Sequence, residues 1–354
     1  MNFYSRRKWR IIRDYIIGWV VAFIFLSIVR GVGTEELGSL QFGFTQSLII
    51  SLTLGPIMGI ISGGSQIWME AKIYKRISIL RFLLIRLLYT LLFIIFLVLA
   101  AYGVYQLYFG TELDIISFAF DDGSAAIYFY VLAIDLVLNI IRQLNLMLGQ
   151  GNLGKLLTGK FYRPREEQRI FMFIDLQSST QLAEKLGHIN YSSLIQDCFN
   201  DLGVVIETGA EIYQYVGDEA VLTWKLQEGL SNENFIKAFF RFKDQLKAKE
   251  TYYRDKYGVV PFFKAGIHAG TVTVTEIGKF KKEIAYHGDT INTAARIQGK
   301  CNELGEELLI SRTLSEHVED DSLTISSVGS LLLRGKQSEM NVFAVQKVLE
   351  ETGA

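Results

Sequence analysis

The chain has 354 residues, of which 50% are hydrophobic, and it carries 36 Lys and Arg against 37 Asp and Glu, a formal net charge of −1. This composition is too apolar for one soluble domain and too charged for a pure membrane bundle, so it predicts a composite protein. The balanced charge offers no clustered basic surface, and we therefore expect no nucleic-acid partner.

The two cysteines, Cys198 and Cys301, lie far apart in polar sequence. Two residues are too few for a disulfide framework or a cysteine-rich zinc site. We interpret both as buried thiols, because free cysteine is among the residue types most often found in protein cores.

Long uncharged runs occur almost entirely before residue 150 and predict four membrane-spanning helices. They cover residues 11–31, 42–66, 84–109 and 124–147, in approximate bounds. The fourth run contains Asp135 and Asn139, which are four residues apart and therefore share a helix face. A carboxylate at that depth should face the bundle interior and find a partner, either as a polar packing contact or as a ligand- or proton-sensing site.

Charges in the connecting segments predict the orientation of these helices. Basic residues gather in the N-terminal tail and after the second and fourth runs: Arg6, Arg7, Lys8, Arg10, Lys72, Lys75, Arg76, Arg142, Lys155, Lys160, Arg163 and Arg165. The other two loops are acidic, with Glu35, Glu36, Glu112, Asp114, Asp121 and Asp122. The positive-inside rule then predicts a multi-pass protein of the cell inner (plasma) membrane, which crosses the lipid bilayer an even number of times and has both termini in the cytoplasm. No small-residue cleavage site follows the first run, so we do not expect a cleavable signal peptide.

From about residue 168 the pattern changes to short β-rich runs that alternate with helical stretches, which indicates an α/β or α+β domain. We therefore divide the chain into a transmembrane domain at residues 1–148, a cytoplasmic linker at 149–167 and a soluble domain at 168–350. The stretch "RIFMFID" is typical of a buried strand, and "EIYQYVGDEAVLTWK" of two strands joined by a tight turn at Gly217 and Asp218.

Two carboxylates stand at the ends of these apolar strands. Asp175 ends the first strand and Asp218 occupies the tip of the predicted hairpin, which should lie beside it. Neither has a basic residue close in sequence, and each alone could be a turn or capping aspartate. As a pair they form a hard, anionic site suited to Mg²⁺ or Mn²⁺ held together with substrate phosphates.

A helix predicted to begin near Asp289 carries Asn292 and Arg296 on one face. Arginine offers a planar fork of donors for phosphate oxygens, and asparagine offers an amide donor. The spacing alone is weak evidence, because many solvated helix faces carry such a pair. Its value comes from its occurrence together with the two aspartates.

In these motifs the sequence resembles the class III nucleotidyl cyclases. "FIDLQSST", "YQYVGDEAVLTW", "GDTINTAARI" and "LLLRGKQSEMNVFAV" match four motifs of that family in order, over nearly all of residues 165–348. The resemblance implies that the four predicted membrane helices are followed by an α+β catalytic domain at residues 168–350, a palm-like sheet flanked by helices. It also implies the conversion of ATP to cyclic AMP and pyrophosphate.

The resemblance also implies roles for single residues. Asp175 and Asp218 would hold two Mg²⁺ or Mn²⁺ ions, with the Leu176 carbonyl as a further ligand. Asn292 and Arg296 would orient the ribose and stabilise the transition state. The remaining positions would bind the triphosphate: Lys336 and, at the start of a helix that favours anions, Ser178, Ser179 and Thr180. Because the family draws the aspartates from one subunit and the Asn-Arg pair from the other, it implies a homodimer with two composite sites.

Two positions depart from the family pattern. Gln214 stands where adenylyl cyclases have a base-selecting lysine, and Ala285 stands where its Asp or Thr partner is common. A glutamine amide both donates and accepts, so Gln214 can bond an adenine edge in either orientation. ATP remains the favoured substrate, with another nucleoside triphosphate or a degenerate site as alternatives. Ser178 and Ser179 replace a Gly and an often aromatic residue.

Several other interpretations compete. "VGDEA" is close to the signature of diguanylate cyclases, but Val216 replaces its first glycine and the Asn-Arg helix has no place there. A membrane receptor or scaffold with a dead cyclase-like domain, or a transporter with an appended regulator, are rivals of another class. His268 suits a buried strand better than a metal site, since no second histidine has ligand spacing. His287 could border a base pocket.

Overall fold

The computed structural model describes residues 3–31, 43–72, 79–110, 114–121, 124–149, 152–331 and 339–348. It divides into two compact units, Met1–Leu144 and Asn145–Ala354. Several residues discussed above lie outside the described residues: Glu35, Glu36, Lys75, Arg76, Glu112, Asp122 and Lys336.

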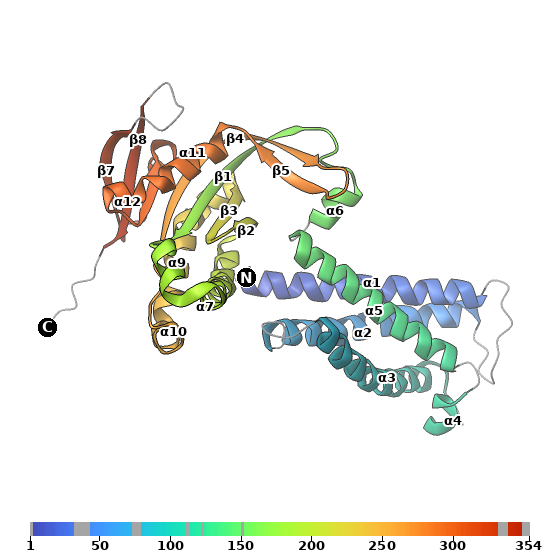
Figure 1. The fold of residues 1–354 in the computed structure, drawn as a ribbon. Helices are drawn as coiled ribbons and strands as arrows, with labels where there is room; N and C mark the ends of the chain where they lie inside the picture. The colour runs from blue at the N-terminus through green and yellow to red at the C-terminus, as the bar shows by residue number, and fades with distance from the viewer. Residues whose placement is uncertain are drawn as a thin grey trace. The chain divides into compact units, whose positions relative to one another are not determined.

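The N-terminal unit consists of helices (Figure 1). They are α1 (Phe3–Gly31), α2 (Phe44–Lys72), α3 (Ile79–Phe109), the short α4 (Ile115–Ala119) and α5 (Ser124–Leu148), the last of which continues past the boundary of the unit. Four segments are long and apolar enough to cross a membrane: Arg7–Arg30, Phe44–Glu70, Leu84–Tyr108 and Ser124–Leu148. The four predicted apolar helices are therefore confirmed.

Helices α1 and α2 pack closely because α2 carries glycines at every fourth position. A Cβ atom on Gly55 would lie 2.9 Å from the Cα atom of Val20. A Cβ atom on Gly59 would lie 2.4 Å from the Cα atom of Ile16. Gly63 continues the same row one turn further along the helix. Such small-residue rows let two helix backbones approach each other in apolar surroundings, where van der Waals packing drives association.

Asp135 lies buried in this unit and is fully hydrogen-bonded, as its depth in an apolar helix requires. Arg86 on α3 donates to both of its carboxylate oxygens, Nη2 to Oδ1 at 2.6 Å and Nε to Oδ2 at 2.9 Å. The hydroxyl of Ser62 donates to Oδ1 at 3.1 Å, and that of Thr90 donates to Oδ2 at 3.2 Å. Asn139 adds a bond to Oδ2 at 3.2 Å. The expected partner of Asp135 is thus Arg86, with which it forms a buried ion pair.

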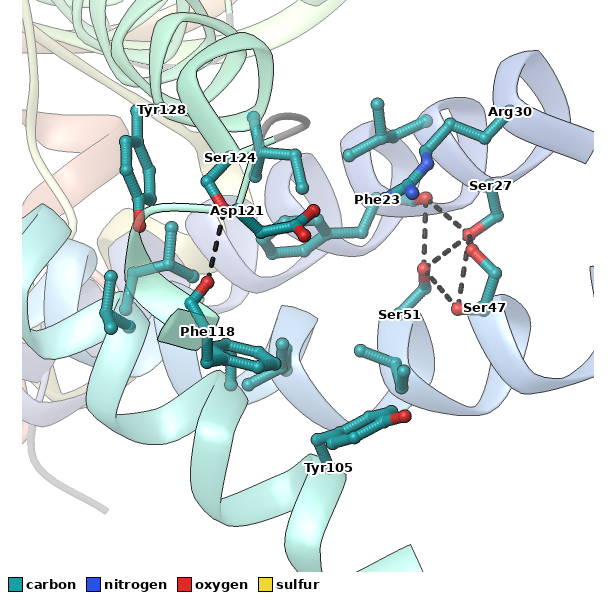
Figure 2. Close-up of a pocket in the computed structure, with 17 residues that line it drawn as sticks. Phe23, Ser27, Arg30, Ser47, Ser51, Tyr105, Phe118, Asp121, Ser124 and Tyr128 are labelled. Carbon is teal, nitrogen blue, oxygen red and sulfur yellow. Dashed lines mark hydrogen bonds between the residues drawn. The ribbon is translucent and has the colours of Figure 1, made fainter. Parts of the chain in front are cut away.

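A cavity of about 120 Å³ lies in another part of the same unit (Figure 2). One end is polar, because the hydroxyls of Ser27 and Ser51 lie 2.6 Å apart and Ser47 donates to Ser27 at 2.9 Å. Phe23 and Leu97 contribute to its apolar walls. None of the residues that bond Asp135 lines this cavity.

The C-terminal unit is built on an eight-stranded mixed sheet. Its strands are β1 (Arg165–Leu176), β2 (Glu211–Val216), β3 (Glu219–Lys225), β4 (Phe263–Ile277), β5 (Glu283–His287), β6 (Leu308–Ser311), β7 (Leu323–Leu331) and β8 (Met340–Lys347). The order is β2-β3-β1-β4-β6-β8-β7, with β5 paired to β4 off this path. The β4–β6 pair is parallel and the others are antiparallel.

The described residues of this unit also form helices, several of which pack against the sheet. They are α6 (Asn152–Leu157), α7 (Ser179–Leu202), η1 (Gly203–Thr208), α8 (Leu226–Leu230), η2 (Ser231–Glu233), α9 (Asn234–Ala248), α10 (Glu250–Tyr257), α11 (Asp289–Gly299), α12 (Cys301–Leu304) and α13 (Arg312–Ser315). Helix α7 is kinked at Gly187 and is followed by the 3₁₀ turn η1. The hairpin at Gly217 and Asp218, the helix from Asp289 and the predicted α+β class are confirmed.

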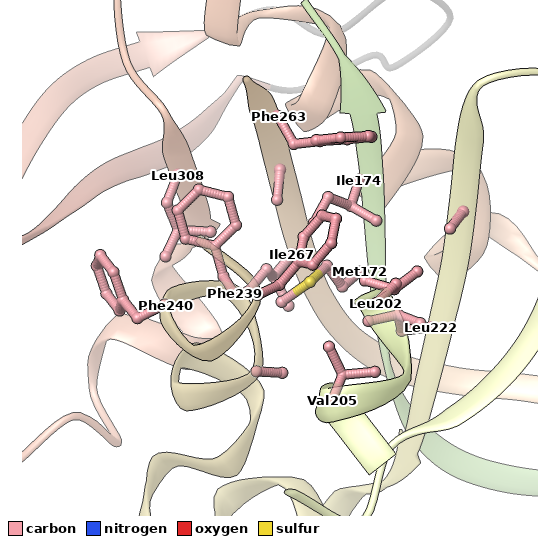
Figure 3. Close-up of a cluster of buried hydrophobic side chains, with 14 of the residues drawn as sticks. Met172, Ile174, Leu202, Val205, Leu222, Phe239, Phe240, Phe263, Ile267 and Leu308 are labelled. Atoms are coloured by element: carbon pink, nitrogen blue, oxygen red, sulfur yellow. The ribbon is translucent and has the colours of Figure 1, made fainter. Parts of the chain in front are cut away.

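Successive side chains of β1 point to opposite faces of the sheet, so this strand contributes to a hydrophobic core on each face. Met172 and Ile174 belong to a large cluster with side chains of α7 and α9 (Figure 3). Phe171 and Phe173 belong to a second cluster on the opposite face, which includes Ala294 of α11. Asp175 continues the series of Phe171 and Phe173, so it lies on the face that α11 covers.

Candidate functional site

Asp175 lies near the end of β1, where strand pairing places it opposite Glu219 of β3 and Lys264 of β4. Directly opposed residues in an antiparallel pair project from the same face of the sheet. Asp175 is half-buried, and its Oδ2 atom lies 3.5 Å from the amide nitrogen of Gln298 on α11. The first expected metal ligand is therefore held between the sheet and this helix.

Asp218 occupies the tip of the β2–β3 hairpin, because Val216 pairs with Glu219 across a two-residue turn. Gly217 has φ 63°, a left-handed conformation that glycine adopts without steric cost. The Oδ2 atom of Asp218 is buried and has no hydrogen-bond partner. A buried carboxylate oxygen without a donor is costly, so this oxygen is available to a ligand that supplies positive charge.

The carboxyl groups here repel one another. Burial and then the charge of Asp218 raise the pKa of Asp175 to about 6. Burial and then the charges of Asp175 and Asp218 raise the pKa of Glu219 to about 7. Burial, followed by the charge of Asp218, also raises the pKa of the Tyr191 phenol. The charge of Asp218 thus acts on both Asp175 and Glu219, which puts the three carboxyl groups in one electrostatic site.

The donor set fits a divalent cation. Among the described residues, no Lys, Arg or His nitrogen lies within the 4.0 Å ion-pair distance of Asp175 or Asp218. In that same part of the chain no group of three or more His, Cys, Asp or Glu side chains is arranged to hold a metal by itself. An ion bound by the two aspartates would therefore complete its shell with backbone oxygens such as the Leu176 carbonyl, with phosphates or with water.

The loop after β1 leads directly into α7, which begins at Ser179. Ser178 has φ 58°, a left-handed conformation, and its side chain makes no capping bond. The glycine that the family has at this position would adopt that conformation freely, whereas serine holds it under strain. Ser178 and Thr180 are exposed and Ser179 is half-buried, so the hydroxyls flank the helix N-terminus where they were expected.

Helix α11 carries the expected Asn-Arg pair. Asn292 is exposed, whereas Thr293 and Ile297 face the sheet and are buried. Arg296 is half-buried, with its Nη1 atom lacking a hydrogen-bond partner and lying 3.8 Å from Asp289. Within the described chain, neither Asn292 nor Arg296 bonds the two aspartates. Gln298 follows Arg296 by two residues, or about 200° around the helix, so Arg296 points away from Asp175.

The two departures from the family pattern lie on neighbouring elements. Gln214 is exposed on the edge strand β2, just after a register shift, and Ala285 is buried in β5. Their sequence neighbours, Tyr213 and Tyr286, stack edge to face with ring centroids 4.9 Å apart. The two strands therefore meet near these positions through aromatic side chains.

The remaining candidates are separate from the aspartates. His268 is buried in β4 opposite Phe171, as expected of a core histidine, and His287 is exposed at the end of β5. Cys198 and Cys301 are both buried free thiols, as the sequence predicts. Lys336 lies outside the described residues.

Two neighbours of Asp175 were not identified from the sequence. Glu219 directly follows Asp218, and its role in the charge cluster depends on the strand register. Gln298 reaches Asp175 because α11 lies unusually close to β4 at Gly266, where a Cβ atom would approach the Gln298 backbone nitrogen to 2.1 Å. Gly266, the first glycine in "FKAGIHAG", is the feature of the sequence that indicates such close packing.

Comparison with known proteins identifies the family. Residues 161–347 match the model of the adenylate and guanylate cyclase catalytic domain. Since this match covers more than half of the chain, the chain belongs to that family, the class III nucleotidyl cyclases.

Individual relatives agree. Adenylate cyclase 2 of Rhizobium meliloti (strain 1021) is 36% identical over 186 residues, which are 52% of this chain and 51% of the relative. Adenylate cyclase 1 of the same organism is 22% identical over 184 residues, 50% of this chain and 27% of the relative. The chain thus spans about half the length, or less, of these relatives. The fold resembles that of a bacterial light-regulated adenylyl cyclase, with a TM-score of 0.53, 17% identity, and coverage of 61% of this chain and 63% of that one.

Proposed function

We propose that the protein is a membrane-anchored adenylate cyclase that converts ATP to cyclic AMP and pyrophosphate. The observation that carries the proposal is the pair Asp175 and Asp218, which stand at one end of the sheet with no Lys, Arg or His nitrogen of the described residues within 4.0 Å of their carboxylates. The 36% identity to a protein named adenylate cyclase 2 supports the choice of ATP.

The aspartates and the Leu176 carbonyl would hold two Mg²⁺ or Mn²⁺ ions. When bound, these ions acidify the ribose 3′-hydroxyl and neutralise the charge of the leaving pyrophosphate. The chain's own residues position the substrate around them. The amides after Asp175, at the start of α7, favour the triphosphate because a helix N-terminus attracts anions. Ser179 and Thr180 stand at this end of the helix.

Arg296 and Asn292 would act on the α-phosphate and the ribose of the bound nucleotide. The guanidinium of Arg296 has an Nη1 donor without a hydrogen-bond partner, and Asn292 is exposed. The arginine fork suits the charge that develops on the α-phosphate oxygens, and the amide suits a ribose oxygen. Lys336, outside the described residues, is proposed to bind the terminal phosphates.

The site is proposed to be composite. Gln298 faces Asp175, whereas Arg296 points to another side of α11, so one chain does not aim both groups at a single substrate. A homodimer with a two-fold axis supplies the aspartates from one subunit and the Asn-Arg pair from its partner, twice.

The membrane part is proposed to anchor and regulate the enzyme. We assign residues 1–148 to the transmembrane domain, 149–167 to a cytoplasmic linker and 168–350 to the catalytic domain, with N-terminus and catalytic domain in the cytoplasm. Basic residues in the tail and the linker support this orientation by the positive-inside rule. Phe161 ties the linker to the sheet, because it is buried and its carbonyl accepts a bond from Glu276 of β4 at 2.9 Å.

A cyclase for another nucleotide is the alternative, because Gln214 and Ala285 replace the usual base selectors. A degenerate receptor or scaffold is less well supported. Such a protein gains nothing from a buried, unbonded oxygen on Asp218, which costs stability.

Turnover of the purified full-length chain tests the proposal. ATP, GTP, CTP and UTP are each offered with Mg²⁺ or Mn²⁺, and the cyclic product is identified by mass spectrometry. We expect cyclic AMP as the main product, and a loss of at least about a hundredfold in Asp175→Ala and Asp218→Ala. Asp244→Ala, which removes an exposed aspartate paired with Lys347 at 2.8 Å, is the matched control and should keep full activity. Near-normal turnover in Asp175→Ala would refute the assignment.

A further inference from the structure

The turn that joins β4 to β5 projects an aromatic side chain into solvent among lysines. Its sequence is Gly278-Lys279-Phe280-Lys281-Lys282, and Phe280 is 99% exposed. The ammonium of Lys279 lies 5.7 Å from the centroid of its ring. Lys281 pairs with Glu283 and Lys282 with Glu276, the latter at 2.6 Å, and both lysines are exposed.

The end of the linker adds residues of the same kind to this surface. Tyr162 is 79% exposed. The pKa of Lys282 is raised mainly by its hydrogen bond with Glu276 and to a smaller extent by the Tyr162 phenol. Lys160 and Arg163 are also exposed. Buried Phe161 fixes this segment beside β4, and Figure 1 shows α6 next to the β4–β5 connection. We call residues 160–163 and 278–282 together the basic-aromatic tip.

Charge and composition select the partner of this surface. The tip carries five basic side chains, of which two are paired with the carboxylates of Glu276 and Glu283, so it is net positive. Aromatic rings favour the headgroup level of a bilayer, and lysines and arginines beside them favour anionic lipids. A protein partner of acidic, apolar character would fit less well, because Phe280 is 99% exposed at the end of a tight turn and its ring is not held in an apolar surface.

The chain itself keeps the tip close to a bilayer. Phe161 follows Leu148, the last residue of α5, by 13 residues. A segment of that length spans at most about 45 Å when fully extended. Since α5 is one of the four helices long enough to cross a membrane, the tip remains within reach of the surface from which the chain emerges.

We propose that the basic-aromatic tip docks on the anionic lipid headgroups of the membrane that anchors the chain, with Phe280 inserted at interfacial depth. The docking gives the C-terminal unit a second attachment besides the linker and restricts its orientation at the membrane. This inference rests on the proposed membrane anchoring and is independent of which nucleotide is cyclised.

Site-directed spin labelling of the full-length chain tests it. Both native cysteines are buried, so a label on Phe280→Cys reacts selectively at the tip. The labelled protein is reconstituted in phosphatidylcholine with phosphatidylglycerol, or in phosphatidylcholine alone. Collisions of the label with oxygen, which enters the bilayer, and with a water-soluble nickel chelate are then measured. Ile189→Cys, at an 83% exposed position on α7, is the matched control.

In the anionic bilayer we expect the label at 280 to be accessible to oxygen and several-fold less accessible to nickel than the label at 189. Replacing Lys279, Lys281 and Lys282 by Gln should abolish the difference, and Glu276→Gln with Glu283→Gln should increase it, because these changes alter the tip charge in opposite directions. Equal nickel access at both positions in the anionic bilayer would overturn the proposal. So would shielding from both probes in either lipid, which would indicate a protein contact. None of these readouts depends on turnover, so a failed cyclase assay leaves the result intact.

Discussion

Gly266 of β4 and Gln298 of α11 are in backbone contact, so that a Cβ atom built on Gly266 would lie 2.1 Å from the Gln298 nitrogen. The same approach allows the Gln298 side chain to reach Asp175 at 3.5 Å. Gly270 repeats the arrangement four residues later, where a Cβ atom would meet the side chain of Thr290 at 2.6 Å. The glycines of one strand thus set the distance between the expected metal site and the Asn-Arg helix.

The first prediction concerns this contact. Gly266→Ala should displace α11, destabilise the protein by about 2–3 kcal/mol as an overpacked core does, and reduce cyclase activity more than tenfold. Thermal unfolding and turnover of the full-length protein measure the two effects. Gly299→Ala, on the same helix with nothing within 4 Å of its Cβ position, should leave both unchanged. Equal behaviour of the two variants would contradict the role of the close packing.

The second prediction is a pH dependence of stability. The folded-state pKa values of Asp175, about 6, and Glu219, about 7, exceed their ordinary values of 3.8 and 4.5. Raised carboxyl pKa values stabilise the fold below the ordinary values, and this stability is lost as the pH rises through 6 and 7. Without divalent ions, the unfolding temperature should therefore fall between about pH 4.5 and pH 7.5 because of these two groups.

Two changes should flatten that slope. Asp175→Asn removes one of the repelling charges, and we expect it to stabilise the metal-free protein at pH 7.5 by about 1 kcal/mol, since water screens a half-buried group. Added Mn²⁺ should likewise raise the unfolding temperature of the wild type at that pH, but not that of Asp175→Asn. An unchanged pH profile in Asp175→Asn would show that the carboxyl repulsion does not limit stability.

The third prediction tests the composite site. Asp175→Ala and Arg296→Ala chains should each be inactive as homodimers. When they are coexpressed, one of the two interface sites in each heterodimer has a complete set of residues. A random mixture should then recover about a quarter of wild-type activity, because half of the dimers are mixed and each has one working site. Lack of recovery in heterodimers verified by differential tags would place the whole site in one subunit.

The fourth prediction concerns base selection. Gln214 is exposed at the β2 edge, and its amide can present either a donor or an acceptor. Gln214→Lys fixes a donor there and should raise the ratio of kcat/KM for ATP over GTP by about tenfold, the value of one charged hydrogen bond. Gln214→Met, which is similar in length but cannot bond, should lower the activity with ATP. An unchanged ratio in the lysine variant would assign selection to other residues, such as His287 or Tyr286.

The sequence predicts those parts of this structure that depend on local pattern. The strand that ends at Asp175, the hairpin tip at Asp218 and the helix from Asp289 follow from apolar alternation, turn residues and helix periodicity. Contacts between distant segments are different. The proximity of Glu219 to Asp175 depends on strand register, and that of Gln298 on the glycine contact with β4. Neither relation is encoded in the spacing of neighbouring residues.

The same distinction applies in the helical unit. Burial of Asp135 is predictable, because an ionised group in an apolar helix must avoid lipid. Its partner is not, since Arg86 lies near the start of the third apolar run and could equally have flanked the membrane. Only the packing of α3 against α5 places the two side chains together.

The fifth prediction uses this ion pair. The Arg86–Asp135 pair is buried, and hydrogen bonds from Ser62, Thr90 and Asn139 occupy the remaining acceptor positions of the carboxylate. The donors on both oxygens of Asp135 favour a packing role over a ligand- or proton-sensing site, while Nη1 of Arg86 is buried without a hydrogen-bond partner. Asp135→Leu leaves the arginine buried without its counterion, which should cost about 3–5 kcal/mol. We therefore expect a lower unfolding temperature in detergent and an altered basal cyclase activity in membranes, because α5 leads directly into the linker.

A double variant distinguishes the effect of a buried arginine without its counterion from the effect of removing both charges. Arg86→Met combined with Asp135→Leu replaces both charges by apolar side chains of similar size, and such replacements are often neutral or stabilising. The double variant should therefore recover the wild-type unfolding temperature. If its basal activity also returns, packing of the helical unit alone sets the output of the catalytic domain. If stability returns while activity stays altered, the charges themselves take part in regulation, and a packing role alone is refuted.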